Sequence, residues 1–199
     1  MTRKVAALAA LICVVAAGCS GNDRGAKARD LPRLVLQSSD LPATFVRFDA
    51  GKQVNADASG DRRLDPERFG RLGGWKARYR LSGTGQAGGP QIVESRADVF
   101  EGSSGAEQDL DAYRSDLAEL AGPTGGRKLQ APALGDEAFA ITRAQGSGRF
   151  RIRLYTIVWR DANVSAALSA TGFDGRFRFE QALALARAQA RRVQAVLGS

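Results

Sequence analysis

Few side chains in this 199-residue chain could carry catalytic chemistry. The sequence contains no histidine, its only methionine is Met1, and its only cysteines are Cys13 and Cys19. Sites in which histidine activates a serine or cysteine nucleophile are therefore excluded, and so are zinc sites built from histidine and cysteine. Carboxylates, lysines, tyrosines and hydroxyls remain for acid–base work. The sequence thus favours a non-enzymatic protein with no metal and no cofactor.

Cys19 follows a segment with the pattern of a secretory signal. A short basic stretch precedes an uncharged run from residue 5 to residue 18, which is too short to span a membrane. The tripeptide Ala16-Ala17-Gly18 before the cysteine resembles the lipobox of bacterial lipoproteins, with alanine where leucine is commonest. This resemblance implies that residues 1–18 are removed and that Cys19 carries acyl chains such as palmitate. We therefore expect an extracytoplasmic protein anchored to the bacterial membrane.

Basic residues dominate the charge of the chain. The net charge is +8, carried by 24 arginines and 5 lysines, and it falls by two to +6 when the signal is removed. Arginine binds carboxylate and phosphate groups through two parallel hydrogen bonds. Export makes nucleic acid an unsuitable partner, so an anionic small molecule, lipid or envelope polymer is the favoured counter-charge. An ordinary solvated basic surface is the alternative.

The sequence predicts one domain behind a short tether. Residues 19–30 show no apolar periodicity and read as the lipidated cysteine and a flexible linker. Residues 31–199 have the length and apolar content of a single globular domain. Within it, residues 50–74 show no strand alternation, and long loops of this kind are where binding residues concentrate.

A ligand site is predicted at this loop and at the strand that follows it. Arginines beside aromatic surface suit an anionic amphiphile, with hydrogen bonds at the head and apolar contact below. The candidate ligand-binding residues are Arg62, Arg63, Arg68, Phe69, Arg71, Trp75 and Arg78. The alternative is a disordered, solvated insertion.

Two rows of basic residues alternate along predicted strands. The rows are Lys76, Arg78 and Arg80 in the first strand, and Arg149, Arg151 and Arg153 in the second. Residues Glu94, Arg96 and Asp98 should share a face with the first row. The rows fit either a cross-strand ladder of opposite charges or an anion-binding face.

Periodicity predicts the elements that must position these residues. Strands are expected at residues 44–48, 75–81, 91–100, 136–142, 149–159 and 164–172, and helices at residues 104–121 and 179–197. The strand at 149–159 becomes apolar on both faces at its end, so that half must be covered on two sides. The GxGxxG at residues 83–88 is followed by a strand instead of a helix, so it is interpreted as a hairpin loop.

The order strand, strand, strand, helix occurs twice. A gap-free shift of 73 residues aligns Phe100-Glu101-Gly102 with Phe173-Asp174-Gly175. We therefore predict an α+β fold with a mainly antiparallel sheet of about six strands, built from two βββα units related by a pseudo-twofold axis. Both helices are expected to pack on one face.

The stretch YTIVWRDANVSAALSATGF at residues 155–173, followed by ALALARAQARRV, carries a distant resemblance. It resembles the extracytoplasmic α+β domains of actinobacterial lipoproteins and, more distantly, the outer sensor domains of actinobacterial Ser/Thr kinases. The resemblance implies a ligand-binding or sensing module and assigns no functional residue. A carboxylate-based envelope hydrolase and a structural or assembly lipoprotein remain as alternatives.

Overall fold

The computed structural model describes residues 25–53, 68–83, 88–121 and 126–199. The strands are β1 (Phe45–Gln53), β2 (Arg71–Leu81), β3 (Pro90–Phe100), β4 (Arg127–Leu129), β5 (Glu137–Gln145), β6 (Ile152–Asp161) and β7 (Val164–Phe173). The α-helices are α1 (Ser103–Ala121) and α2 (Phe179–Leu197), and short 3-10 helices include η1 (Ala28–Arg33) and η2 (Ser38–Asp40). None of the helices described is long and apolar enough to cross a membrane.

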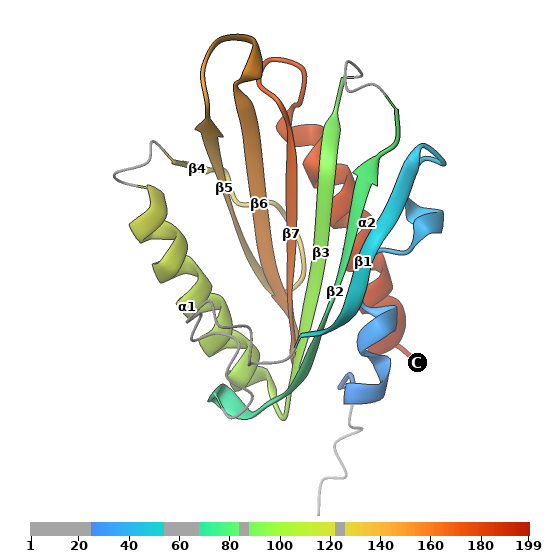
Figure 1. Ribbon diagram of the computed structural model, residues 1–199. Coiled ribbons are helices and arrows are strands. Elements are labelled where there is room, and N and C mark those ends of the chain that lie inside the picture. Colours follow the sequence, from blue (N-terminus) through green and yellow to red (C-terminus); the bar gives the residue numbers. More distant parts are fainter. Residues whose placement is uncertain (1–24, 54–67, 84–87, 122–125) are drawn as a thin grey trace, which may run out of the picture.

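All seven strands form one antiparallel sheet in the order β1-β2-β3-β7-β6-β5-β4 (Figure 1). The predicted α+β fold class is confirmed. The sheet has one strand more than expected, because the three-residue β4 pairs with β5. Strands β2 and β3 pair directly with each other, so the glycine-rich segment between them connects a hairpin, as predicted.

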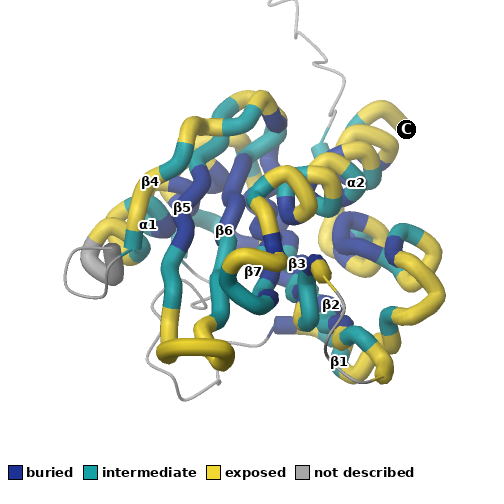
Figure 2. The backbone as a smooth tube through the Cα atoms, turned by 90° about the horizontal axis from the view of Figure 1, so that it is seen from above, coloured by how far each residue is buried: buried dark blue, intermediate teal, exposed yellow. Residues whose placement is uncertain are grey.

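The two helices cover opposite faces of the sheet, so the prediction of one shared face is wrong. Leu110 and Tyr113 of α1 pack on Val158 and Ala167, whereas α2 packs in the core that contains Ile157, the residue next to Val158. Neighbouring residues of a strand point to opposite faces, so one helix covers each side. Figure 1 shows α1 in front of the sheet and α2 behind it, and Figure 2 shows buried residues concentrated between them.

The apolar character of the central strands explains why the two helices lie on opposite faces of the sheet. Strands β6 and β7 are apolar on both faces near their shared turn, and Val164, Ala166, Ala167 and Leu168 are all buried. A single helix layer would leave one of these apolar faces in water. The expected covering of β6 on two sides is confirmed, and it is this requirement that places a helix on each face.

The internal repeat holds in the strands and fails in the helices. Strands β3 and β7 occupy equivalent central positions and pair antiparallel, and each ends in a phenylalanine before its helix. Helix α1 begins three residues after Phe100, whereas α2 begins six residues after Phe173, so the 73-residue shift leaves the starts of the two helices three residues apart. A twofold axis exchanging β3 and β7 would also place both helices on one face, which is not observed.

The N-terminal segment packs on the α2 face of the sheet from residue 25 onward. Ala26 is 3% exposed and exchanges two 2.9 Å hydrogen bonds with the side chain of Asn163 in the β6–β7 turn. Leu34, Val35 and Leu36 have no exposed surface. The part of the predicted tether at residues 25–30 is therefore attached to the domain, because apolar residues on both sides of η1 fill the core. Residues 1–24 lie outside the described residues.

The predicted loop at residues 50–74 is strand at both ends. Strand β1 continues to Gln53 and β2 begins at Arg71. Glycines at positions 51, 73 and 74 interrupt the apolar alternation, so these strand ends are not visible in the sequence pattern. The middle of the predicted loop, residues 54–67, lies outside the described residues.

Candidate functional site

The structure separates the candidate ligand-binding residues predicted from the sequence. Arg62 and Arg63 lie outside the described residues, while Arg68 contacts the ring of the neighbouring Phe69 at 4.4 Å. The register places Trp75 on the face covered by α2, where it packs against the main core, and Arg78 on the opposite face. Ligand binding at these positions stays a prediction, and Trp75 and Arg78 do not line one surface.

Arg71 is part of a buried ion pair. Its side chain is 2% exposed, and its Nε donates a 2.6 Å hydrogen bond to Asp98 Oδ1, with a second bond from Nη2 to the same oxygen. A side chain at position 74 would collide with this pair, so the glycine there provides its space. The pair has the burial and geometry of a structural element of the sheet.

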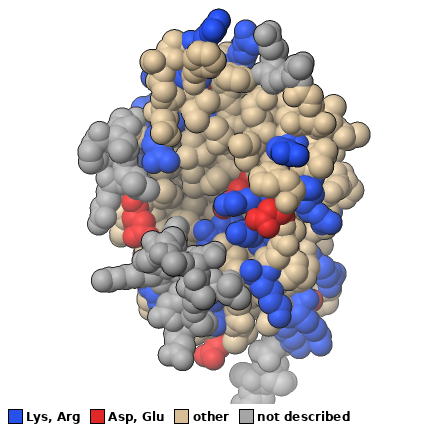
Figure 3. Space-filling view, in the orientation of Figure 1, with Lys and Arg blue, Asp and Glu red and all other residues tan. Residues whose placement is uncertain are grey.

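Lys76 and Arg78 of the first basic row pair with carboxylates on the face covered by α1. Arg78 Nε donates to Glu94 Oε2 at 2.5 Å, and both Arg78 and Lys76 lie within 3.8 Å of Asp49. Figure 3 shows basic and acidic side chains next to each other near the middle of this face, below an area without charged side chains. The arrangement matches the cross-strand charge ladder.

Two arginines of the second basic row converge on one carboxylate. Arg151 and Arg153 lie 3.0 and 2.8 Å from the Asp174 oxygens. The hydrogen bond from Arg153 is the main reason that the pKa of Asp174 lies below its usual value, and the charges of both arginines add to the shift. Arg149 lies apart, over the exposed ring of Phe150. Arg151 and Arg153 therefore already have an anionic partner.

Two pairs of carboxylates lie close together along the described part of the chain, Asp109 with Asp111 and Asp136 with Glu137, and their surroundings do not resemble those of a catalytic acid and base. Asp111 pairs with Arg114 on the surface of α1, while Asp109 is buried on the same helix. Asp136 and Glu137 both pair with Arg160. The described residues also contain no group of three or more acidic side chains that could hold a metal ion.

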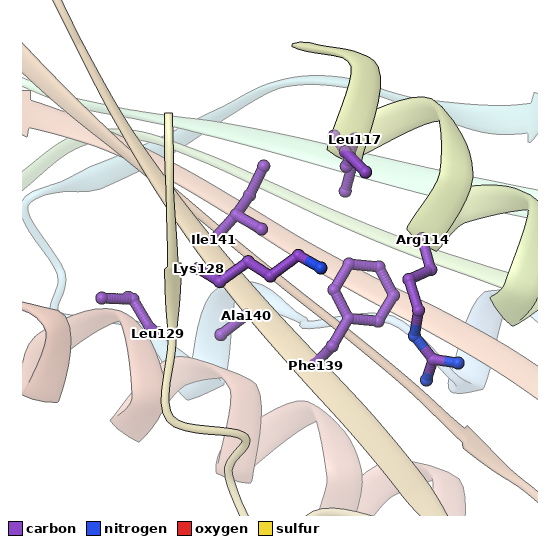
Figure 4. A pocket seen from close by; sticks show the side chains of 8 residues that line it. Arg114, Leu117, Lys128, Leu129, Phe139, Ala140 and Ile141 are labelled. Carbon is purple, nitrogen blue, oxygen red and sulfur yellow. The ribbon is translucent and has the colours of Figure 1, made fainter. Parts of the chain in front are cut away.

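A pocket of about 90 Å³ lies between α1 and strands β4 and β5. Its lining is largely apolar and consists of Arg114, Leu117, Ala118, Lys128, Leu129, Phe139, Ala140 and Ile141. Figure 4 shows the Phe139 ring at the centre, Leu117 above it, and the Lys128 side chain extending toward the ring. A cavity of about 150 Å³ binds benzene, so this pocket can take a short apolar group while the rest of a ligand stays outside.

The two cations of the pocket differ in their partners. Arg114 donates to Asp111 at 2.8 Å and to Glu137 at 2.6 Å, and the latter bond lowers the pKa of Glu137. No carboxylate partner of Lys128 is found in the part of the chain that the structure describes. Lys128 is exposed, so its charge can pair with an anionic group at the pocket mouth.

The sequence did not reveal this pocket because it did not reveal β4. A strand of three residues is too short to show alternation, and the segment Arg127–Leu129 carries only one apolar side chain. One feature of the sequence does mark this strand. Lys128 and Leu129 stand between two segments rich in glycine, alanine and proline. Leu117 contributes to the pocket as a half-buried residue of α1.

Asp161 at the end of β6 should make stability depend on pH. Burial is the main cause of its raised pKa, and the charge of Asp136 adds to it. A raised pKa means that this carboxylate stabilises the fold when protonated, and that this contribution is lost as the pH rises through the folded-state pKa. Asp161→Asn should therefore raise the melting temperature at pH 7 and have little effect below about pH 3.8, the usual aspartate value.

Thermal unfolding of the wild type and the variant between pH 3 and pH 8 checks this. Asp111→Asn is the matched control, because the Asp111 side chain is 63% exposed and pairs with Arg114 at 2.8 Å, so its replacement should not raise the melting temperature at pH 7. Equal melting temperatures of wild type and Asp161→Asn across the range would refute the assignment.

Comparison with known proteins finds a solved structure with a similar fold. The sequence matches no family model and no curated protein. The structure is similar to the crystal structure of the extracellular domain of PknH from Mycobacterium tuberculosis, with a TM-score of 0.65 and 12% sequence identity. The similarity covers 88% of this chain and 98% of that domain. This chain therefore has the fold of a bacterial extracellular domain over nearly its whole length.

Proposed function

We propose that this protein is a lipid-anchored extracytoplasmic module that binds an anionic amphiphile in the pocket between α1 and β5. The observation that carries the proposal is the combination of an apolar pocket with Lys128, a cation with no carboxylate partner among the described residues. Ligand pockets typically combine apolar walls with a few polar groups that fix orientation. The shared fold with the PknH extracellular domain supports a sensing role outside the cell.

Cys19 is the proposed site of lipid attachment. Ala26 is packed into the domain, and the chain from Cys19 to residue 25 can span at most about 20 Å when fully extended. This is half the reach that a linker of residues 19–30 would have. The anchor would therefore keep the domain close to the membrane surface, where amphiphiles with an acidic headgroup are available.

In the proposed complex, a short apolar group of the ligand contacts Phe139, Leu117 and Ile141. Contact with these side chains removes apolar surface from water, which contributes about 25 cal/mol per Å². The anionic head lies at the mouth and pairs with the Lys128 ammonium. Arg114 supports the wall of the pocket, with its guanidinium 5.5 Å from the centre of the Phe139 ring.

Binding of octanoate and octylammonium by calorimetry tests this proposal. The protein is the chain from residue 19 onward carrying Cys19→Ala, which contains every described residue. Octanoate should bind more tightly than octylammonium. Lys128→Glu should weaken octanoate binding about tenfold, or about 1.4 kcal/mol, because the charge reversal replaces an attraction at the pocket mouth with a repulsion. The same variant should bind octylammonium more tightly.

Lys52→Glu is the matched control, because it makes the same charge change on β1, at the other edge of the sheet. It should leave both affinities unchanged. Equal effects of the two variants would mean that net charge alone governs binding, and the pocket would then not be the site.

A further inference from the structure

A second hollow of about 280 Å³ lies on the α2 side of the molecule. One wall is the segment that precedes β5, and the other is the C-terminal half of α2. Its lining residues are Ala133, Leu134, Gly135, Arg187, Ala190, Arg191 and Gln194. It shares no lining residue with the pocket between α1 and β5, so the two can be tested separately.

Arg187 and Arg191 lie one turn apart on α2 and are both exposed. Neither has a carboxylate partner among the described residues, whereas the adjacent Arg192 binds Asp40 through bonds of 2.5 and 3.0 Å. Like charges four residues apart destabilise a helix. Two such arginines at the edge of a hollow therefore suit the binding of an anion better than the stabilisation of α2.

The opposite wall is held in place by the sheet. Gly135 has φ = +55°, and a Cβ there would collide with the carbonyl oxygen of Arg160. The next residue, Asp136, donates its amide to the same carbonyl at 2.8 Å. The backbone of this wall is thus held in place before a ligand arrives, which lowers the entropic cost of binding.

We propose that this hollow binds a phosphate group. The planar guanidinium groups of Arg187 and Arg191 can each donate two parallel hydrogen bonds to phosphate oxygens, and the Gln194 amide can donate another. Both inorganic phosphate and the phosphodiester of a lipid headgroup present this chemistry.

The hollow lies toward the end of the molecule where the N-terminal segment begins. Gly135 adjoins Asp136, which bonds to Arg160 near the β6–β7 turn, and Asn163 of that turn holds Ala26. If Cys19 carries lipid, this end is the one close to the membrane. The phosphate site itself does not depend on lipid attachment or on the amphiphile pocket.

The experiment compares Arg187→Gln/Arg191→Gln with the parent chain from residue 19 onward carrying Cys19→Ala. One arm titrates inorganic phosphate and glycerol 3-phosphate by calorimetry. The other arm measures cosedimentation with vesicles of phosphatidylglycerol and, as a neutral comparison, phosphatidylcholine. The double variant should weaken binding of at least one phosphate probe about tenfold or more. Arg29→Gln/Arg149→Gln removes the same charge from two other exposed arginines and should have no such effect.

Each result decides the proposal. Arginine-dependent binding of the soluble phosphates supports a free phosphate ligand, and arginine-dependent binding restricted to phosphatidylglycerol vesicles supports a lipid headgroup. Absence of binding in both arms, or equal losses in the two double variants, would overturn the site. Octanoate binding by Arg187→Gln/Arg191→Gln should match the parent, which separates this outcome from the fate of the amphiphile pocket.

Discussion

Asp98→Ala should lower the stability of the domain far more than the loss of an exposed charge on the same sheet. It removes the carboxylate that accepts two hydrogen bonds from Arg71, whose side chain is 2% exposed. Breaking a buried ion pair from one side costs about 3–5 kcal/mol, a large fraction of the total stability of a typical domain. Urea unfolding monitored by circular dichroism measures the change.

Glu94→Ala is the control for Asp98→Ala. It breaks the Arg78–Glu94 pair on the same face, but the Arg78 side chain is 41% exposed, and exposed pairs contribute at most about 1 kcal/mol. Equal losses of stability in the two variants would contradict the assignment of Arg71–Asp98 as a structural pair. Such a result would also reopen Arg71 as a candidate ligand-binding residue.

Cys19→Ala should have the largest effect on cellular location. Firm membrane attachment requires two or more acyl chains or a second signal, and the variant lacks the thiol that would carry the lipid. The protein should move from the membrane fraction to the soluble fraction if the signal is still removed, or keep its unprocessed length if it is not. Mass spectrometry of the N-terminal peptide and cell fractionation measure both outcomes.

Cys13→Ala serves as the comparison for Cys19→Ala. That cysteine lies within the predicted signal, so its replacement should leave lipidation and membrane attachment intact. A wild-type N-terminal peptide without a diacylglyceryl mass on Cys19 would refute the lipid anchor.

Periodicity in the sequence was sufficient to predict the bounds of the long helices and strands. The helix predicted at residues 179–197 has the bounds of α2, and the strand predicted at 91–100 differs from β3 by one residue. In these segments the apolar positions recur at one clear spacing, which burial of a single face produces. Helix α1, β5 and β7 were likewise predicted to within a few residues.

The faces of the helices and the pairing of the charges required the structure. The apolar pattern of β6 indicated cover on two sides, but the apparent repeat placed both helices on one face. Which helix covers which side depends on how the chain leaves Phe100 and Phe173, and these exits differ in length. The pairing of Arg71 with Asp98 and the position of Lys128 beside the pocket likewise depend on strand register, which spacing along the chain does not reveal.

The most direct test of the amphiphile pocket is the position of bound octanoate, measured from intermolecular nuclear Overhauser effects. We expect contacts from the terminal methyl group to Phe139, Leu117 and Ile141, with the carboxylate end nearest Lys128. The exposed apolar side chains Val46 and Phe48 of β1 and Ile92 of β3, in the half of the sheet away from β4 and β5, provide the alternative surface. Contacts to those residues, with none at Phe139, would contradict the proposed binding site.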